Sequence, residues 1–278
     1  MLRVENLSFS YNEDKYILKN LSFSIKKGEF TAIIGQNGSG KTTLLKQLNG
    51  LLRPSQGRIF IDGSDISSIR TSVLARSIGF LFQNPDHQIF CSTVYEEIAF
   101  GLKNMKLGKD NVDRLVREAA AMVSISEYLD SSPFNLSKGQ RQRVALASVL
   151  AMETDILVLD EPTTGQDYRE GMEIMNIVLN LNKKGKTIII VTHDMELVSR
   201  YARRTIILKD GQILEDGHTR AVLAKKESLA ASNLQPPQVY SLAEMFKKQG
   251  LFEDACTVEE MFCEIMDYLE GEKNVRIN

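Results

Sequence analysis

The chain has 278 residues, enough for one large domain with a smaller appended unit, and its 43% hydrophobic and 25% charged residues are typical of a globular protein. A formal net charge of -2 gives no electrostatic support for a nucleic acid as the main partner. Three cysteines without C-x-x-C spacing are too few for a disulfide framework.

The first residues, 1–5, follow the alternating pattern of a strand and not the pattern of a signal peptide. No apolar run along the chain approaches the roughly 20 residues that span a bilayer. We therefore expect a cytosolic protein with reduced thiols, which acts at a membrane only by docking on another subunit that spans it.

Strand-like and helix-like patterns alternate along the chain. Apolar residues recur at alternate positions over much of the first 30 residues, which predicts half-buried strands. Apolar residues at helical spacing predict a helical insert between about residues 85 and 152, and a helix over residues 169–182. Further strands are expected over residues 30–34, 58–63, 78–83, 156–159 and 187–191. Short apolar strands that alternate with helices predict an α/β fold with a parallel sheet covered on both faces.

The segment 223–278 differs in its sequence pattern from the residues before it and is expected to form a small helical extension. A Gln-Pro-Pro break lies at residues 235–237, and Thr257 and Glu260 have the spacing that caps a helix. One stripe of this helix is apolar and consists of Val258, Met261, Phe262, Ile265, Met266 and Leu269. The stripe either packs on the chain's own core or forms an interface with another subunit.

Residues 35–42 match the phosphate-cradling pattern G-x-x-x-x-G-K-[ST] at every fixed position, between a strand pattern and a helix pattern. Glycines let successive N–H groups turn inward at a helix N-terminus and bind an anion. We expect Lys41 to reach the β- and γ-phosphates of a nucleotide and the Thr42 hydroxyl to bind Mg²⁺. The predicted phosphate-binding residues are Gly35, Gln36, Asn37, Gly38, Ser39, Gly40, Lys41, Thr42 and Thr43. The spacing is not the G-x-G-x-x-G of dinucleotide-binding folds, so the hypothesis of a dinucleotide-binding enzyme that transfers hydride lacks its main evidence.

Two carboxylates, Asp160 and Glu161, follow four consecutive apolar residues. A buried strand that ends there would place both side chains beside the phosphate loop of a neighbouring strand. Asp160 suits Mg²⁺, because hard cations prefer oxygen ligands. Glu161 suits the orientation and polarisation of a water molecule for in-line attack on the γ-phosphate.

A second helix start has the features of a phosphate site, and its residues are Leu136, Ser137, Lys138, Gly139 and Gln140. A Ser–Gly start offers a hydroxyl and free N–H groups at the positive end of the helix dipole. Because one nucleotide already has its own loop, we infer that this helix caps the nucleotide held by another subunit. The inference predicts a head-to-tail dimer with two ATP molecules between the subunits.

These motifs and the sequence Thr-His-Asp at residues 192–194 stand in the order and spacing of ATP-binding-cassette (ABC) ATPases, which the chain resembles over about residues 1–220. The resemblance implies a P-loop NTPase fold with a RecA-like parallel-sheet core, N-terminal antiparallel strands and a helical subdomain. On this basis the nucleotide-binding domain is expected over residues 1–222, its helical subdomain over about 85–152, and a C-terminal helical extension over 223–278.

The resemblance also implies roles for single residues. Tyr11 matches the aromatic residue that stacks on adenine, although it also fits a plain strand residue. Gln83 matches the Q-loop glutamine, which contacts Mg²⁺ and the attacking water. Asp167 matches the D-loop aspartate that crosses to the partner subunit. His193 matches the switch histidine that touches the γ-phosphate, and with Glu161 and Gln83 it completes the expected catalytic set.

Two positions depart from the commonest family pattern. Lys138 occupies the third signature position, where glycine is commonest, and its charge either lies near the γ-phosphate or points to solvent. The D-loop region 163–167 reads Thr-Thr-Gly-Gln-Asp in place of the commoner Ser-x-Leu-Asp. We expect this change to alter how the two subunits touch. Neither departure removes a catalytic group.

Residues 84–90, Asn-Pro-Asp-His-Gln-Ile-Phe, resemble the Q-helix segment of ATPases in energy-coupling factor (ECF) transporters, the importers of vitamins and transition-metal ions. Lys138, residues 163–167 and the segment 235–238 also resemble that group. The resemblance implies that Asp86 and Gln88 couple the ATPase to a transmembrane scaffold (EcfT-like), where Asp86 would meet arginines. A separate substrate-binding membrane subunit completes such a transporter, and the ATPase is peripheral on the cytoplasmic face of the cell membrane.

Other assignments stay open at this point. An ATPase of a conventional ABC importer or exporter would dock on ordinary permease subunits. A cytosolic ABC machine that acts on DNA or ribosomes is disfavoured, because the chain carries neither a long coiled-coil insert nor a second cassette. The sequence does not distinguish a homodimer from a heterodimer with another ABC ATPase, and it does not reveal the transported solute.

Overall fold

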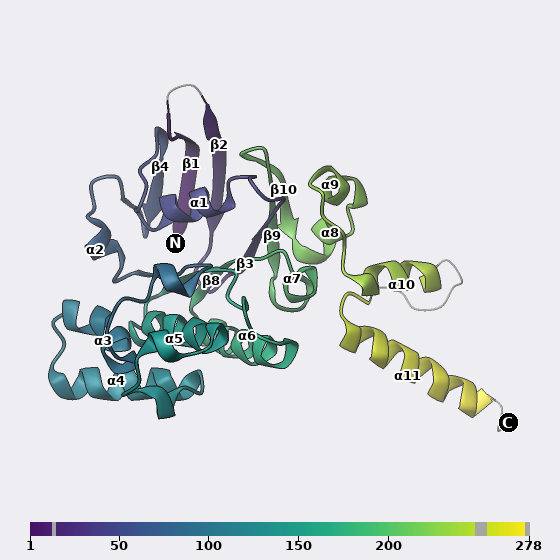
Figure 1. Ribbon diagram of the computed structural model, residues 1–278. Coiled ribbons are helices and arrows are strands. Elements are labelled where there is room, and N and C mark those ends of the chain that lie inside the picture. The colour runs from purple at the N-terminus through teal and green to yellow at the C-terminus, as the bar shows by residue number, and fades with distance from the viewer. Residues whose placement is uncertain (13–14, 248–254, 276–278) are drawn as a thin grey trace.

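Two β-sheets organise the chain, and helices lie between them and cover the outer face of one (Figure 1). The structure is a computed structural model that describes residues 1–12, 15–247 and 255–275. Within these residues, no helix combines the length and the apolarity that crossing a membrane requires.

The smaller sheet is antiparallel and has the strand order β2-β1-β4-β5. Its strands are β1 (Leu2–Ser10), β2 (Tyr16–Ile25), β4 (Gln56–Ile61) and β5 (Ser64–Asp65). The N-terminal half of β1 alternates buried apolar and more exposed polar residues, as its sequence pattern predicts.

The larger sheet has the strand order β10-β9-β3-β8-β7-β6 and is parallel except for β10, which pairs antiparallel with β9. Its strands are β3 (Phe30–Ile34), β6 (Ile78–Leu81), β7 (Ile156–Asp160), β8 (Thr187–Val191), β9 (Arg204–Lys209) and β10 (Gln212–His218). In the central strands, Ile33 pairs with Val191, and Val191 pairs with Asp160. The loops that leave the carboxyl ends of β3, β7 and β8 therefore meet at one edge of the sheet.

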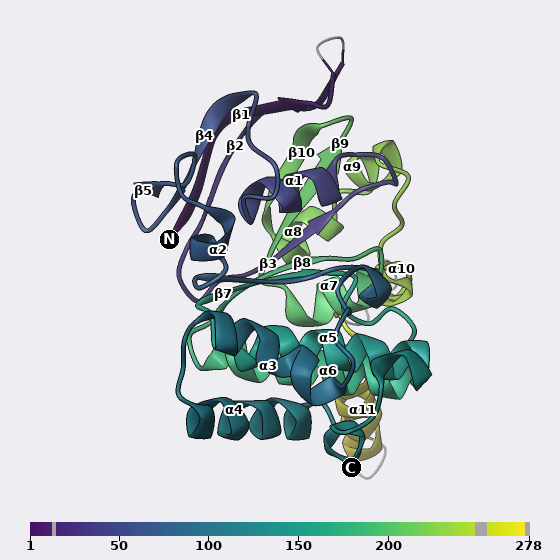
Figure 2. The ribbon, with the colours of Figure 1, turned by 60° about the vertical axis from the view of Figure 1, so that its left-hand side comes forward.

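Helices flank the parallel sheet on both of its faces (Figure 2). Helix α1 lies between the two sheets, whereas α3 to α6 form a layer on the other side of the parallel sheet. The helices are α1 (Lys41–Leu48), α2 (Thr71–Leu74), α3 (Val94–Asn104), α4 (Lys109–Met122), α5 (Lys138–Ala151), α6 (Tyr168–Lys183), α7 (Met195–Tyr201), α8 (Thr219–Leu223), α9 (Lys226–Ala231), α10 (Gln238–Lys247) and α11 (Val258–Val275). Short 3₁₀ turns are η1 (Pro85–His87), η2 (Ser126–Tyr128) and η3 (Pro133–Asn135).

The parallel strands are buried on both faces, so each strand contributes to two hydrophobic cores. On β7, Leu157 and Leu159 pack toward the helical layer, while Ile156 and Val158 pack toward α1 and the antiparallel sheet. This division follows from the two-residue period of a strand and explains why these strands are mostly apolar on both faces. The predicted parallel sheet covered on both faces is confirmed.

The predicted elements are present, with shifts of about two residues at some boundaries. The strand expected over 78–83 ends at Leu81, and the strand expected over 58–63 is β4, which ends at Ile61. Thr93 and Glu96 have the spacing of a capping box at the start of α3, but the box forms only in part. Thr93 Oγ1 accepts from the Glu96 N–H at 3.2 Å, but the Glu96 carboxylate accepts from Ser92 Oγ instead of reaching back to the Thr93 N–H.

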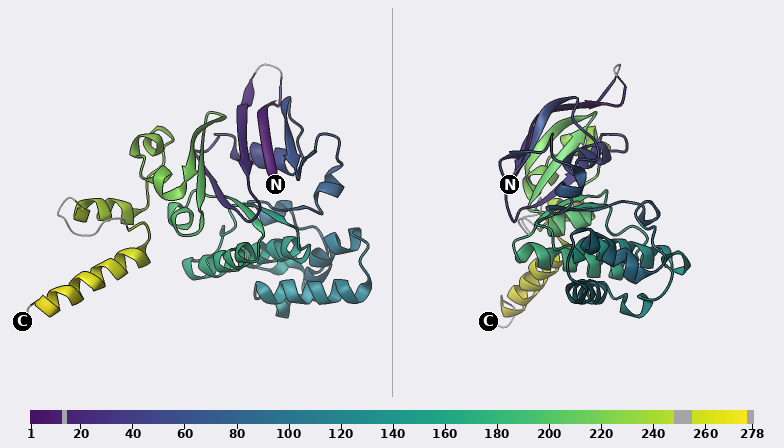
Figure 3. Two further views of the ribbon diagram at one scale, coloured as in Figure 1. Left: turned by 180° about the vertical axis from the view of Figure 1, so that it is seen from behind. Right: turned by 90° about the vertical axis from the view of Figure 1, so that its left-hand side faces the viewer.

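Helices α10 and α11 project away from the two sheets (Figure 3). The apolar stripe of α11 is divided between two environments. Met261 is buried against Val239 and Ala255, and Ile265 packs on the same small cluster. The remaining stripe residues are exposed: Val258, Phe262, Met266 and Leu269. Of the two alternatives for the stripe, packing on the chain's own residues therefore accounts for only part of it.

Candidate active site

Segments that are far apart in the sequence meet at the carboxyl ends of β3, β6 and β7 and line one open cavity. The lining residues are Tyr11, Ile17, Asn37, Gly38, Gly40, Lys41, Thr42, Thr43, Gln83, Asp160, Glu161 and Val191. The structure thus brings the predicted phosphate loop, both carboxylates, the Q-loop glutamine and the aromatic residue of the N-terminal sheet into one place. The signature residues and Asp167 are not among the residues that line this cavity.

The phosphate loop connects β3 to α1 and ends at Gly40, a position that only glycine fits. Gly40 is the N-cap of α1 and has φ of 104° in the left-handed region. A Cβ atom there would lie 2.7 Å from Leu18 Cδ2 and 3.3 Å from the carbonyl oxygen of Ile17. No side chain caps the first turn of α1, so its N–H groups can bind an anion.

Lys41 directs its charge into the loop. Its Nζ donates to the carbonyl oxygens of Gly35 at 2.7 Å and Gln36 at 2.9 Å. Desolvation by burial lowers the pKa of Lys41, and the carboxylates of Glu161 and Asp160 act in the opposite direction. The buried Ser39 hydroxyl has no hydrogen-bond partner among the residues that the structure describes. A loop with a desolvated cation and an unused hydroxyl fits a phosphate group.

Thr42 and Asp160 form an oxygen pair suited to a divalent cation. The Thr42 hydroxyl donates to Asp160 Oδ2 at 3.3 Å, although the two residues are 118 positions apart. Burial raises the pKa of Asp160 to about 6, against the Thr42 hydrogen bond that lowers it. A hydroxyl and a carboxylate beside a phosphate loop fit Mg²⁺, which is usually bound by one or two carboxylates together with substrate phosphates. Gln83, the third predicted ligand, is exposed and lines the same cavity.

Glu161 and His193 are in direct contact. Glu161 is 8% exposed, and its Oε1 accepts from the His193 N–H at 3.1 Å and lies 2.8 Å from His193 Nδ1. Its Oε2 accepts from the Thr192 hydroxyl at 3.2 Å. Glu161 adopts a left-handed φ of 51°, which is unusual for a residue other than glycine and is held by these bonds. The contact of Thr192 with Glu161 was not predicted from the sequence.

Tyr11 follows the last residue of β1 and stands beside the phosphate loop. Its hydroxyl lies 3.4 Å from Thr43 Oγ1, and its ring packs edge-on against Phe9 with a centroid separation of 4.9 Å. The side chain is 58% exposed and lines the cavity. An exposed ring at this place is able to stack on a base, and its role in adenine binding stays a prediction.

The signature segment begins α5 with a complete capping box, which sequence analysis did not name. Ser137 Oγ accepts from the Gln140 N–H at 3.2 Å, and Gln140 Oε1 accepts from the Ser137 N–H at 2.9 Å. The S-x-x-Q spacing is the signal that would have revealed it. Ser137 and Lys138 are exposed, so this helix start is open to another molecule.

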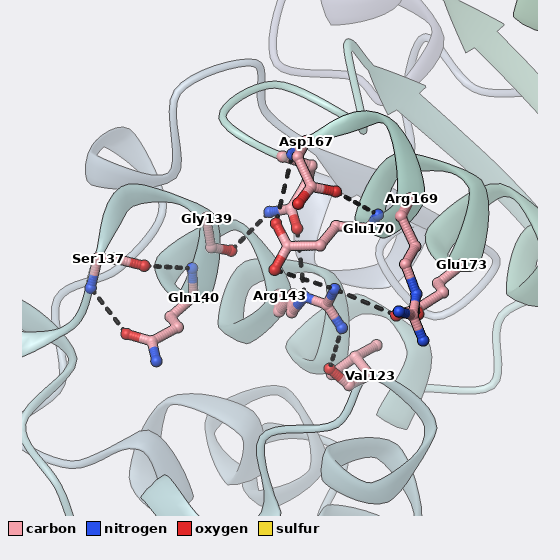
Figure 4. A network of polar contacts seen from close by, with 10 residues as sticks. Val123, Ser137, Gly139, Gln140, Arg143, Asp167, Arg169, Glu170 and Glu173 are labelled. Carbon is pink, nitrogen blue, oxygen red and sulfur yellow. Dashed lines mark hydrogen bonds and ion pairs between the residues drawn. The ribbon is translucent and has the colours of Figure 1, made fainter.

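The D-loop aspartate caps a helix within its own chain. Asp167 Oδ1 accepts from the Glu170 N–H at 2.8 Å, and the Glu170 carboxylate accepts from the Asp167 N–H at 3.4 Å (Figure 4). The neighbouring Gln166 and the buried Arg143 form a network that joins this loop to the signature segment. Gln166 had been considered only as part of the departure at residues 163–167, and no role had been predicted for Arg143.

The two predicted coupling residues differ in environment. The Asp86 side chain is 51% exposed and pairs with Arg141 of α5, with Oδ1 and Nε 2.8 Å apart. Gln88 is bonded within the chain, because its Nε2 donates to the Ala145 carbonyl at 3.0 Å and its Oε1 accepts from the Phe82 N–H at 3.2 Å. Asp86 is therefore accessible to a partner, whereas Gln88 braces its own segment against α5.

An apolar groove lies between β6, α3 and α5, and Gln88 is one of its lining residues. Phe90 and Phe100 are 60% and 45% exposed, and their rings pack edge-to-face with centroids 4.8 Å apart. Phe82 and Met152 also line the groove. Exposed aromatic residues that gather in one groove are typical of a surface that binds another protein.

The raised pKa of Asp160 generates a prediction about stability. The charged carboxylate costs stability above pH about 6, and the cost disappears as the pH falls from 6 toward the ordinary aspartate value. We expect Asp160→Asn to stabilise the nucleotide-free protein at pH 7.5 by roughly 1–3 kcal/mol, with a smaller difference at pH 5. Urea unfolding at both pH values measures this effect. Asp130→Asn, which changes an exposed carboxylate, is the matched control, and a destabilised Asp160→Asn at pH 7.5 would contradict the assignment.

Residues 18–164 of the chain match the family model described as ABC transporter. The chain is 44% identical to the energy-coupling factor transporter ATP-binding protein EcfA2 of Caldanaerobacter subterraneus subsp. tengcongensis, over an alignment of 284 positions that covers 99% of each protein. A putative ABC transporter ATP-binding protein of Methanosarcina mazei is 47% identical over 249 residues, which are 90% of this chain. The chain covers only 42% of that longer relative.

Among solved structures, the chain is similar to CbiO1 from Clostridium perfringens, which is part of the ABC transporter complex CbiONQ. The TM-score is 0.74 at 41% sequence identity, and the match covers 87% of this chain and 98% of that chain. The predicted ABC ATPase fold, with its parallel-sheet core, antiparallel N-terminal strands and helical layer, is thereby confirmed. The chain belongs to the ABC transporter family.

Proposed function

We propose that this chain is the ATP-hydrolysing, energy-coupling subunit of an ECF-type importer for a vitamin or a transition-metal ion. The observation that carries the proposal is the single cavity in which Lys41, Asp160 and Glu161 meet at the carboxyl ends of parallel strands. The similarity to an ECF ATP-binding protein over 99% of both chains supports the transporter class. A conventional ABC importer or exporter is the alternative, and it would differ in the membrane subunits that the ATPase binds.

The residues divide the chemistry of ATP hydrolysis among them. Lys41 leaves the loop carbonyls and binds the β- and γ-phosphates, where the N–H groups at the start of α1 also donate. Glu161 orients and polarises the attacking water, and His193, which contacts Glu161, would touch the γ-phosphate. Thr42, Asp160 and Gln83 would hold Mg²⁺, which supplies neutralisation of phosphate charge when it is bound.

A second subunit completes the site in this proposal. Ser137 and Lys138 are exposed and are not part of their own chain's cavity, so they are available to the ATP of a partner. ATP would close a head-to-tail homodimer or heterodimer, because the signature residues gain contacts with the partner's γ-phosphate only in the closed state. Hydrolysis removes this contact and opens the dimer, since a ligand shifts an equilibrium only through differential contacts.

The groove of Phe90 and Phe100 is the proposed docking place for the transmembrane scaffold. Gln88 and Phe90, which follow Gln83 in the chain, line this groove, so a change at the nucleotide has a short path to this surface. Phe90 and Phe100 would contact apolar side chains of the scaffold, and the Asp86 carboxylate would bind a scaffold arginine together with its own Arg141. The ATPase would then be peripheral on the cytoplasmic face of the membrane, and the scaffold would act on a separate substrate-binding membrane subunit.

The extension over residues 223–278 is proposed as a second contact between ATPase subunits, separate from the nucleotide-binding domain over 1–222. The exposed part of the α11 stripe supplies an apolar surface for this contact, with Phe262 61% exposed. The extension also reaches the nucleotide site of its own chain. Asn233 Nδ2 donates to Gln36 Oε1 at 2.7 Å, although 197 positions separate the two residues.

Substitution of the loop lysine tests whether the cavity hydrolyses ATP. Lys41→Ala removes the cation that binds the β- and γ-phosphates, and we expect it to lower the ATPase rate by at least about 100-fold. A phosphate-release assay with purified protein measures this rate. Lys27→Ala, an exposed lysine in the turn before β3, should retain the wild-type rate. An ATPase activity that survives Lys41→Ala would belong to another site or to a contaminant.

Substitution of Glu161 separates ATP binding from hydrolysis. Glu161→Gln keeps an acceptor for the Thr192 hydroxyl but loses the carboxylate that polarises water, so we expect a rate at least about 100-fold lower with ATP binding retained. The closed dimer should then accumulate with ATP, and size-exclusion chromatography with light scattering will detect it. Glu118→Gln on the surface of α4 serves as the control. Rapid hydrolysis by Glu161→Gln would overturn the role assigned to Glu161.

A further inference from the structure

The side-chain amide of Gln166 joins the D-loop to the signature segment of the same chain (Figure 4). Its Nε2 donates to the carbonyl oxygen of Gly139 at 2.8 Å, and its Oε1 accepts from Arg143 Nε at 3.2 Å. Both ends of the amide are therefore used. Gly139 and Arg143 are four positions apart on one face of α5, which is the separation that one glutamine is able to bridge.

The two segments also approach each other through their backbones. A Cβ atom on Gly139 would lie 2.9 Å from the carbonyl oxygen of Gly165 and 3.1 Å from Gln166 Nε2. Gly165 has a left-handed φ of +79°, and a Cβ atom there would lie 3.3 Å from Lys138 Cγ. The stem of Lys138 thus covers the D-loop glycine. The two departures from the commonest family pattern, Lys138 and the Gly165–Gln166 pair, therefore lie side by side.

Arg143 anchors this link to the rest of the molecule. Its side chain is 9% exposed, and Nη1 donates to the carbonyl oxygen of Val123 at 3.1 Å, just after α4. Nη2 lies 3.5 Å from a Glu173 carboxylate oxygen and 3.7 Å from one of Glu170, both on α6. The guanidinium therefore holds α4, α5 and α6 together, and Gln166 adds the D-loop to this group.

We propose that Gln166 is a positioning residue, which fixes the signature turn against the segment that carries Glu161. Gly139 is two positions from Ser137, which would bind the partner's nucleotide, and Gln166 is five positions from Glu161, which would act on the subunit's own nucleotide. The Gln166 amide makes the two move as one unit. The inference rests on the proposed function, because linking these two segments affects hydrolysis only if two subunits form a composite nucleotide site.

Two substitutions separate the parts of the link. Gln166→Met keeps the length of the side chain and removes both hydrogen bonds. Gln166→Glu keeps an acceptor for Arg143 but replaces the donor to Gly139 with a carboxylate oxygen facing a carbonyl oxygen. If Gln166 only supported Arg143, Gln166→Glu would retain that role. If Gln166 positions the signature turn, both variants lose that role. Arg169→Ala is the matched control, because this residue is 88% exposed in the first turn of α6 and, although it pairs with Glu173, it makes neither contact of Gln166.

ATPase kinetics and dimer formation provide the functional test. We expect both Gln166 variants to lower kcat by roughly fivefold to tenfold, the effect of losing one or two modest hydrogen bonds at the transition state. In the Glu161→Gln background both should need more ATP to form the dimer. Each isolated variant should bind a non-hydrolysable ATP analogue with an affinity close to that of the wild type. The midpoint of its thermal unfolding should also stay close to the wild-type value. Wild-type kcat in Gln166→Glu, or a loss of kcat matched by equal losses in nucleotide affinity and stability, would overturn the proposal.

Hydrogen–deuterium exchange of the isolated subunit gives a readout that does not depend on hydrolysis. Gln166→Met and Gln166→Glu should increase exchange in peptides that cover residues 137–140, and Arg169→Ala should not. Unchanged exchange in both Gln166 variants would overturn the positioning role. Failure of the proposed function is seen separately, as an ATPase activity of the wild type that Lys41→Ala does not reduce.

Discussion

The in-register pairing of β8 between β3 and β7 is the constraint on which the site depends. Val191 pairs with Ile33 on one side and with Asp160 on the other, so three strands end at the same level. The phosphate loop, Glu161 and His193 follow directly from these ends. A slip of this register would turn the apolar side chains of the strand to the wrong face, and both cores oppose it.

The electrostatics of the cavity point to a ligand that carries charge of both signs. Burial raises the pKa of Asp160 and lowers that of Lys41, so the fold disfavours both charged forms in the free protein. A phosphate group beside Lys41 and a divalent cation beside Asp160 would compensate these costs. The same groups that reduce the stability of the free protein thus favour a nucleotide with its metal ion.

Local motifs made much of the fold and the site predictable. The phosphate loop and the end of β7 depend on residues that are adjacent in sequence, and the apolar strands reveal a sheet buried on both faces. Contacts between residues far apart in the sequence were not predictable. Gln88 bonds to Ala145, 57 positions away, and Gln166 bonds to Gly139, 27 positions away. No pattern in a single sequence reports such pairs, because propensity and periodicity describe only neighbours.

The central claim is that a nucleotide site at one sheet edge drives a membrane partner docked in the groove of Phe90 and Phe100. The most direct measurement is mass spectrometry of the proteins retained by the tagged wild-type chain from detergent-solubilised native membranes, in parallel with a Phe90→Ser, Phe100→Ser double variant. The account predicts a multi-span scaffold and a small substrate-binding membrane protein with the wild type, and their loss with the double variant. Recovery of soluble partners alone would contradict the account, and paired conventional permeases would contradict its ECF assignment.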